Sequence, residues 1–271
     1  MTTTMKTMGK SRLRAHLSAG GFVFLLGAVA GCGASSENDN VSAALDSLES
    51  ANSEGTLLAV ALDGATSAMS ADEVAQNAAA NAGRYLVPAG CVSAQATGAS
   101  VAYTLNRCSG PYGLFDLTGR VTASFSIQTS GVQVSLASTG LRINGAMVDF
   151  QSTAVYSTSG SGRSLSLNST STGAGARGSQ FRRVGDYTAS WDGSCLDLDG
   201  VWTTSAFGRT WSTTVANYRH CTGRCPEVGG TITLSGDILG GPITLSYDGD
   251  STARWATANG RSGVTPVACG L

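Results

Sequence analysis

Apolar residues alternate with small or polar ones along most of the chain after Cys91, and this pattern constrains the fold more than any other feature. The period of two begins at Val101, Tyr103 and Leu105 and returns in residues 121–127, 132–136, 187–191, 211–215, 232–234, 243–247 and 253–255. It is the period of a β-strand that buries one face. Short turns between neighbouring runs, such as residues 129–131, favour antiparallel pairing. We therefore expect a mainly β fold, either an antiparallel sandwich or a partly open barrel.

One or two helices are expected before this region. A short amphipathic helix is indicated by four apolar residues at helical spacing, Val41, Ala44, Leu45 and Leu48. A second helix should begin after Ser70, because Ser70 and Glu73 have the spacing of a capping box. Its apolar stripe is formed by Val74, Ala78, Ala82 and Tyr85. Residues 157–178 are so rich in Ser and Gly that a long mobile loop or slender edge strands are expected there.

The first 31 residues have the three parts of an export signal. Four basic side chains at residues 6–14 precede an apolar run at residues 22–30, which ends at Gly31-Cys32. The run is shorter than the roughly 20 residues that a transmembrane helix needs. The segment Val29-Ala30-Gly31-Cys32 resembles the lipobox of bacterial lipoproteins. The alternative is an ordinary secretory signal that Cys32 follows by coincidence.

The lipobox resemblance implies a lipid anchor and a place in the cell. In such lipoproteins the chain is cut before the cysteine, and the cysteine becomes an acylated N-terminus. Cys32 would then hold the protein to a membrane through three acyl chains, which bind far more firmly than one. Gly33 is compatible with sorting to the outer membrane, on either its periplasmic or its surface face. The membrane is therefore the first expected partner.

The remaining cysteines indicate a disulfide framework. Removing Cys32 leaves an even number, namely Cys91, Cys108, Cys195, Cys221, Cys225 and Cys269. An even number in an exported chain is typical of disulfides. Cys91 and Cys108 stand apart from the others and should pair locally. The other four should staple the C-terminal half, and we expect Cys195 with Cys221 and Cys225 with Cys269.

The charge of the chain after residue 31 argues against nucleic acid as a partner. This part contains 13 basic and 18 acidic residues, a net charge of −5, and none of its basic residues is a lysine. Its only basic pair is Arg182-Arg183. A surface that neutralises phosphates needs a basic stripe or patch. We expect instead an envelope protein or a glycan as a second partner.

Catalytic and metal-binding residues are scarce. His220 is the only histidine after the signal, and no Gly-x-Ser-x-Gly motif occurs, so a Ser–His or Cys–His mechanism would have to use His220. We interpret His220 as a surface or packing residue. His220-Cys221-x-x-x-Cys225 has two zinc-ligand types, but an oxidising compartment favours disulfides. No metal, cofactor or catalytic residue is predicted.

Acidic and aromatic residues offer two further candidates. Asp192, Asp197 and Asp199 could supply oxygens to calcium, although Asp followed by Gly is first of all a turn. Paired carboxylates could also hydrolyse glycosides, but nothing places two of them across a cleft. The aromatic residues Trp191, Trp202, Trp211, Trp255, Tyr187, Tyr218 and Tyr247 gather in the C-terminal half. They could form a platform for sugars or apolar ligands, or they could pack the core, which we favour.

The chain is thus expected to have four parts: a signal peptide (1–31), a tether with a short helix (32–55), a helical segment (56–90) and a disulfide-stapled β domain (91–271). Residues 108–113, 221–226 and 247–249 loosely resemble uncharacterised envelope lipoproteins of myxobacteria, a resemblance that implies no activity. The first hypothesis is an anchored, non-enzymatic binding or structural β domain. The alternative is a carrier or sensor of a lipid or other apolar ligand, which needs an apolar cavity inside the sheet. A surface hydrolase is third.

Overall fold

The computed structural model describes residues 35–112, 114–143, 145–159, 162–174, 180–192, 194–238, 240–267 and 269. Cys32 and the expected signal peptide lie outside this part of the chain. In the described residues two helices, α1 (Ser35–Ala61) and α2 (Ala71–Tyr85), precede all the strands. None of the described helices has the length and apolar character needed to cross a membrane.

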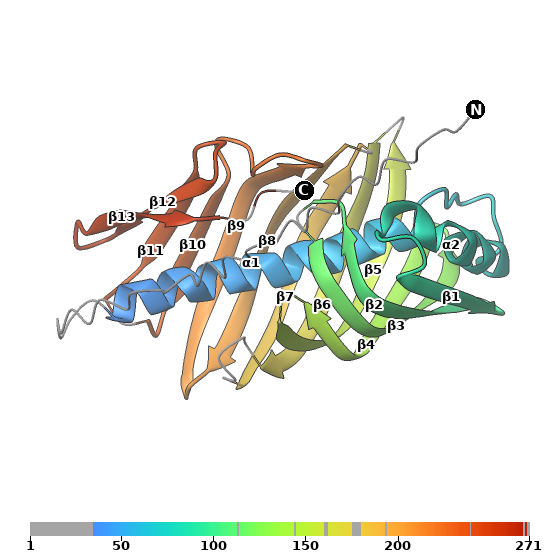
Figure 1. The fold of residues 1–271 in the computed structure, drawn as a ribbon, viewed down its shortest axis with the longest axis horizontal. Coiled ribbons are helices and arrows are strands. Elements are labelled where there is room, and N and C mark those ends of the chain that lie inside the picture. Colours follow the sequence, from blue (N-terminus) through green and yellow to red (C-terminus); the bar gives the residue numbers. More distant parts are fainter. Residues whose placement is uncertain are drawn as a thin grey trace, which may run out of the picture. The chain divides into compact units, whose positions relative to one another are not determined.

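Every strand pairs antiparallel with its neighbours in sequence, and together they form one sheet (Figure 1). The strands are β1 (Val92–Thr97), β2 (Ser100–Gly110), β3 (Leu114–Gln128), β4 (Gly131–Ile143), β5 (Ala146–Ser159), β6 (Gly162–Ala174), β7 (Gln180–Trp191), β8 (Cys195–Ala206), β9 (Arg209–Cys221), β10 (Thr231–Gly236), β11 (Ile243–Tyr247), β12 (Thr252–Thr257) and β13 (Ser262–Pro266). The predicted mainly β, antiparallel fold with one or two N-terminal helices is confirmed, and two helices are present in the described residues. The sheet is a single open one, so of the two expected architectures it corresponds to the partly open barrel.

Helix α1 lies along the inner face of this curled sheet (Figure 1). It contacts β3 and β4 on one side and β9, β10 and β11 on the other. Residues 51–61 of α1 are all buried, and the helix is therefore part of the core. Gly55 brings the helix backbone close to the sheet, since a Cβ atom there would lie 3.6 Å from the Cβ of Ala189. The helix expected near Val41 is thus correct in place, but "short" was wrong.

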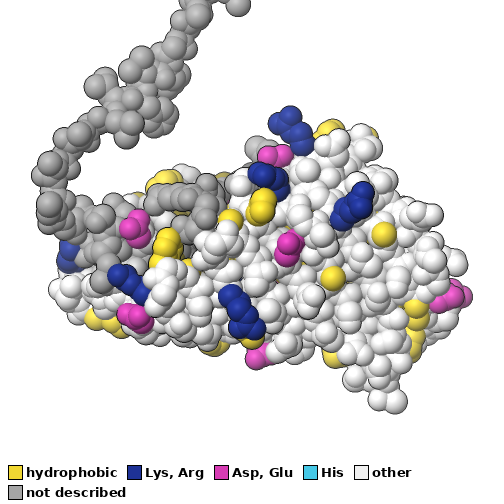
Figure 2. Space-filling model, turned by 90° about the horizontal axis from the view of Figure 1, so that it is seen from below, with side chains coloured by type: hydrophobic (Ala, Val, Ile, Leu, Met, Phe, Trp, Pro, Cys, Tyr) yellow, Lys and Arg dark blue, Asp and Glu magenta, His cyan; other side chains and the backbone are white. Residues whose placement is uncertain are grey.

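The inner face of the sheet is apolar and the outer face is polar. In β8, for example, Leu196, Leu198 and Trp202 are buried, while Val201 and Thr203 between and beside them are exposed. Figure 2 shows one face of the molecule, on which charged and hydrophobic side chains are few and scattered. This distribution explains the strong period-two pattern, because a sheet wetted on one side buries only every second residue.

The described residues between 157 and 174 form strands inside the sheet, so the long loop and the edge position expected for residues 157–178 were both wrong there, while residues 175–178 lie outside the described part of the chain. β5 continues to Ser159, and β6 is a long strand in the middle of the sheet, between β5 and β7. Its inward residues include the buried Ser169 and Ser171. Leu165 and Leu167 are buried and alternate with serines, but from Ser169 to Thr172 small hydroxyl side chains occupy both faces of the strand, so the apolar alternation ends there.

Two glycines allow unusually close contacts. Gly200 lies directly opposite Tyr187 in the register of β7 and β8, and a Cβ atom on Gly200 would meet the Cβ atom of Tyr187 at 2.2 Å. Gly119 adopts a φ of 137° at an irregularity between β3 and β4. Such irregularities bend a strand and increase its twist, and they also occur between β4 and β5 and between β8 and β9. They help the sheet to curl around α1.

The capping box and the disulfides agree with the sequence. The Ser70 side chain accepts a hydrogen bond from the Glu73 backbone N–H, and the Glu73 carboxylate accepts one from the Ser70 backbone. The disulfides are Cys91–Cys108, Cys195–Cys221 and Cys225–Cys269. These are the pairs that we expected.

Candidate functional site

A cavity of about 780 Å³ lies between the N-terminal half of α1 and the inner face of the sheet. This volume is within the range of roughly 300 to 1,000 Å³ that is usual for small-molecule sites. The helix contributes one face to the wall, from Asp39 through Ala43 and Asp46 to Ser50. The spacing of three or four residues along this face is that of one side of an α-helix.

The opposite wall comes from one end of the sheet. The end of β4, the starts of β5, β7 and β9, and the ends of β8 and β10 lie together there, because antiparallel neighbours bring such ends to the same edge. Most of this wall is apolar, with Ile143, Val148, Phe181, Ala206 and Trp211 among its residues. The topology therefore builds a pocket with a hydrophobic sheet wall and a polar helix wall.

Glu49 is the notable polar group of the helix wall. Its carboxylate is mostly buried, and it forms no hydrogen bond or ion pair with any other described residue. Burial, with a smaller effect of the nearby Asp46, raises the pKa of Glu49 to about 7. The cavity thus contains a carboxyl group that exchanges its proton near neutral pH.

Arg183 crosses from the sheet to the helix beside the cavity. Its guanidinium donates hydrogen bonds to the backbone carbonyl of Ser47 at 2.6 Å and to Oγ of Ser50 at 2.8 Å. The guanidinium also lies 5.4 Å from the ring centre of Trp202. Burial lowers the pKa of Arg183, and the charge of Glu54 opposes this effect. Arg183 therefore fixes the helix to the sheet.

Glu54 is the buried partner charge on α1. Its side chain is 1 % exposed. One carboxylate oxygen accepts a hydrogen bond from the hydroxyl of Ser152, and both accept from the hydroxyl of Ser169, at 2.7 and 2.9 Å. The inward serines of β5 and β6 therefore have a role: they satisfy a charged group of the helix that the sheet encloses.

Two polar atoms in the cavity wall lack a partner. Oγ1 of Thr204 and Nε1 of Trp211 are buried and form no hydrogen bond in the described part of the protein. Their residues are 5 % and 8 % exposed, and both line the cavity. A buried polar group without a hydrogen bond costs about 1 to 3 kcal/mol, so each of these atoms lowers the stability of the fold.

The histidine considered for catalysis is a structural residue. His220 is 2 % exposed, and its two ring nitrogens are used by Tyr218 and Arg224. The carbonyl of Arg224 can only accept, so Nε2 carries the proton and donates at 2.9 Å, while Nδ1 accepts from the Tyr218 hydroxyl at 3.1 Å. Burial lowers the pKa of His220. The imidazole is neutral and has no free nitrogen for a reaction.

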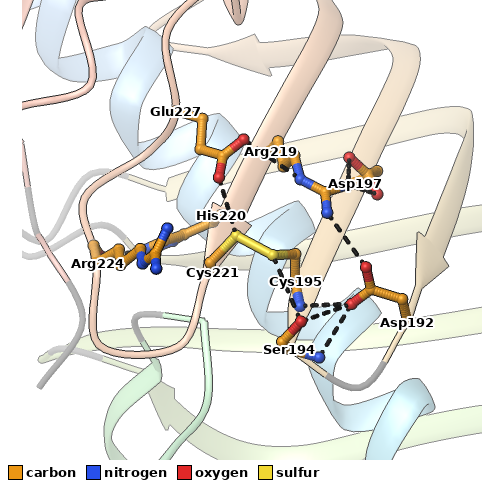
Figure 3. The surroundings of a disulfide bond; sticks show 9 residues. All are labelled: Asp192, Ser194, Cys195, Asp197, Arg219, His220, Cys221, Arg224 and Glu227. Atoms are coloured by element: carbon orange, nitrogen blue, oxygen red, sulfur yellow. Dashed lines mark hydrogen bonds and ion pairs between the residues drawn. A yellow bond between two sulfur atoms is a disulfide. The ribbon is translucent and has the colours of Figure 1, made fainter.

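The proposed zinc and calcium ligands have other partners. Figure 3 shows Cys221 bonded to Cys195, with Glu227 beside the disulfide. Arg219 binds Asp197 at 2.7 Å, Asp192 at 3.2 Å and Glu227 at 3.3 Å. These carboxylates therefore surround a guanidinium.

The turn at Asp192 is held by local hydrogen bonds. Its carboxylate accepts from the backbone N–H groups of Ser194 and Cys195 and from the Ser194 hydroxyl, which holds the pKa of Asp192 well below its usual range. The carboxylate of Asp199 accepts from the backbone of Asn217. Each of the three aspartates considered as calcium ligands thus has a structural role at a strand end or bulge.

The aromatic residues of the C-terminal half pack the core, as we favoured. Tyr156 stacks on Trp191, and Tyr187 meets Trp202 edge to face. Trp191, Trp202 and Trp211 are all buried. They form no exposed platform, although Trp211 also lines the cavity.

Sequence reasoning missed the residues that shape this cavity. Arg183 was noted only as half of a basic pair, yet it has the same strand phase as Tyr187, Ala189 and Trp191 and therefore points inward with them. That phase was a readable signal. Glu49 and Glu54 gave no such signal, because a glutamate in a helix normally faces water.

A search against protein families, curated proteins and solved structures found no match to this chain.

Proposed function

We propose that this protein is a lipid-anchored carrier or sensor of the bacterial envelope, which holds an amphipathic ligand between α1 and its curled sheet. The observation that carries the proposal is the cavity of about 780 Å³ with its apolar sheet wall. An apolar cavity inside the sheet is the feature that distinguishes a carrier from a module that only packs its own core. The anchor rests on the resemblance of residues 29–32 to a lipobox.

The anchor suits such a function. The cavity is lined by the first turns of α1, and Cys32 precedes this helix by only a few residues. A carrier held at the membrane would meet amphipathic molecules where they concentrate. Outer-membrane placement and a protein or glycan partner remain part of the proposal.

A non-enzymatic structural module is the second candidate. It is favoured by α1 itself, which fills most of the inner face of the sheet and is buried all round at residues 51–61. In this view the helix is the permanent occupant of the sheet and the protein acts through its outer surface. The two candidates differ in whether the remaining cavity binds a ligand.

We expect the cavity to bind 1-octanol, and we expect larger side chains in its walls to prevent this binding. The test uses the acyl-free protein, the full chain with Cys32→Ala, and isothermal titration calorimetry. The double variant of the acyl-free protein, Ala43→Phe with Ala206→Phe, adds one aromatic ring to the helix wall and one to the β8 wall. The two rings reduce the volume of the cavity. Affinity should fall about tenfold or more, since overpacking costs roughly 1 to 3 kcal/mol.

The matched control adds the same two rings to exposed positions, as Val201→Phe with Ala102→Phe. It should bind octanol like the parent protein. Equal octanol binding by the narrowed variant and its control would place the ligand elsewhere, and no binding by the parent would favour the structural module.

A further inference from the structure

We propose that the cavity selects ligands with a cationic head group on an apolar body, and that Glu49 is their counter-charge. This inference rests on the proposed function, because it assumes that the cavity holds a ligand. It concerns the chemical class of that ligand: an alkyl amine or a quaternary ammonium amphiphile, in contrast to a neutral or an acidic lipid.

Among the described residues, the carboxylate of Glu49 is a buried charge of the cavity wall with no counter-charge in contact. Arg183 and Glu54 compensate each other, and the guanidinium of Arg183 is already engaged by Ser47, Ser50 and the ring of Trp202. Glu49 has no such partner among the described residues. A buried charge without a partner is costly, so a cation that reaches Glu49 gains more than an anion that would have to compete for Arg183.

The cavity wall suits the rest of such a ligand. Phe181 and Trp211 offer aromatic rings, which attract alkylammonium groups through their faces. Ile143, Val148 and Ala206 offer apolar contacts for a chain.

Binding of a cation should be linked to the ionisation of Glu49. The charged and titratable groups that line the cavity with Glu49 are Asp39 and Asp46 on α1, Arg183 on β7, Arg209 on β9 and Asp237 after β10. Asp46 acts on the pKa of Glu49, and the charge of Glu49 helps to raise the pKa of Tyr218 on β9. Since the pKa of Glu49 is about 7 in the empty cavity, a bound cation would lower it and release a proton. Affinity should therefore rise with pH through neutrality, by about tenfold between pH 6 and pH 8.

Three eight-carbon probes test the inference on the acyl-free protein: octyltrimethylammonium, 1-octanol and octanoate, each titrated at pH 6 and pH 8. At pH 8 the cation should bind about tenfold more tightly than octanol, the equivalent of one ion pair in a partly buried site, and octanoate should bind most weakly. Glu49→Gln should abolish both the preference and its pH dependence. Asp149→Asn, on the exposed face of β5, is the charge-matched control and should change neither.

A second readout needs no variant. Titration of the parent protein with octyltrimethylammonium at pH 7, in two buffers of different ionisation enthalpy, should show release of roughly half a proton per ligand bound. Equal affinity for the three probes, a preference for octanoate, or binding without proton release would overturn the cationic selectivity while leaving the carrier function intact. If none of the probes binds, the proposed function itself fails.

Discussion

Arg183→Met is expected to lower the free energy of unfolding by about 3 kcal/mol or more. The change removes the hydrogen bonds from β7 to Ser47 and Ser50 on α1. It also leaves Glu54 buried without the positive charge that now acts on it. Methionine retains most of the volume of the side chain, so lost packing contributes little. Urea denaturation of the acyl-free protein, followed by circular dichroism, measures the effect.

The neighbouring residue provides the control. Arg182 is exposed, and Arg182→Met should change stability by less than about 0.5 kcal/mol. Adding Glu54→Gln to Arg183→Met should restore part of the loss, because the buried charge is then removed as well. Similar effects of the two arginine variants, or strictly additive effects of Glu54→Gln and Arg183→Met, would show that α1 is not held by this charge arrangement.

Glu49→Gln is expected to stabilise the empty protein at pH 8 and to leave it unchanged near pH 4. The pKa of Glu49 is raised from 4.5 to about 7 in the folded state. The folded protein therefore retains this proton over a range where the unfolded chain has lost it, and stability falls as pH rises through that range. Because Glu49 is partly open to the cavity, the expected gain at pH 8 is roughly 2 to 3 kcal/mol.

The measurement is the free energy of unfolding at several pH values between 4 and 8, with and without the substitution. The difference between the two proteins should grow from pH 4.5 to pH 7 and then level off. The Asp149→Asn variant should show no such growth. A constant difference across the pH range would mean that the carboxyl group of Glu49 is as well solvated in the cavity as it is in the unfolded chain.

The β fold was predictable because the sequence pattern that marks each strand depends only on residues close together in the chain. A sheet that buries one face leaves a period of two in the sequence, and residues 101–105, 121–127 and 187–191 carry it plainly. The capping box at Ser70 is equally local, since both of its hydrogen bonds join residues three positions apart. The even number of cysteines indicated disulfides, and spacing indicated the local pair Cys91–Cys108, but spacing alone did not determine how the other four cysteines pair.

The burial of α1 was not predictable in this way. Its residues 51–56 are Ala, Asn, Ser, Glu, Gly and Thr, which have no apolar stripe. Their burial depends on the inward serines of β5 and β6, which lie about a hundred residues away and bind Glu54. The cavity could not be predicted for the same reason. Its lining residues, such as Glu49, Phe181 and Trp211, are far apart in the sequence and come together only when the sheet curls around the helix.

Native mass spectrometry of the protein extracted gently from its own membrane fraction tests the central claim most directly. The account predicts a chain that begins at Cys32 and carries acyl mass, together with a further small molecule that leaves on denaturation and is absent from the Ala43→Phe and Ala206→Phe double variant. A protein that begins elsewhere and lacks acyl mass would contradict the anchor. An acylated protein with no additional molecule, identical in the parent and the double variant, would contradict the carrier.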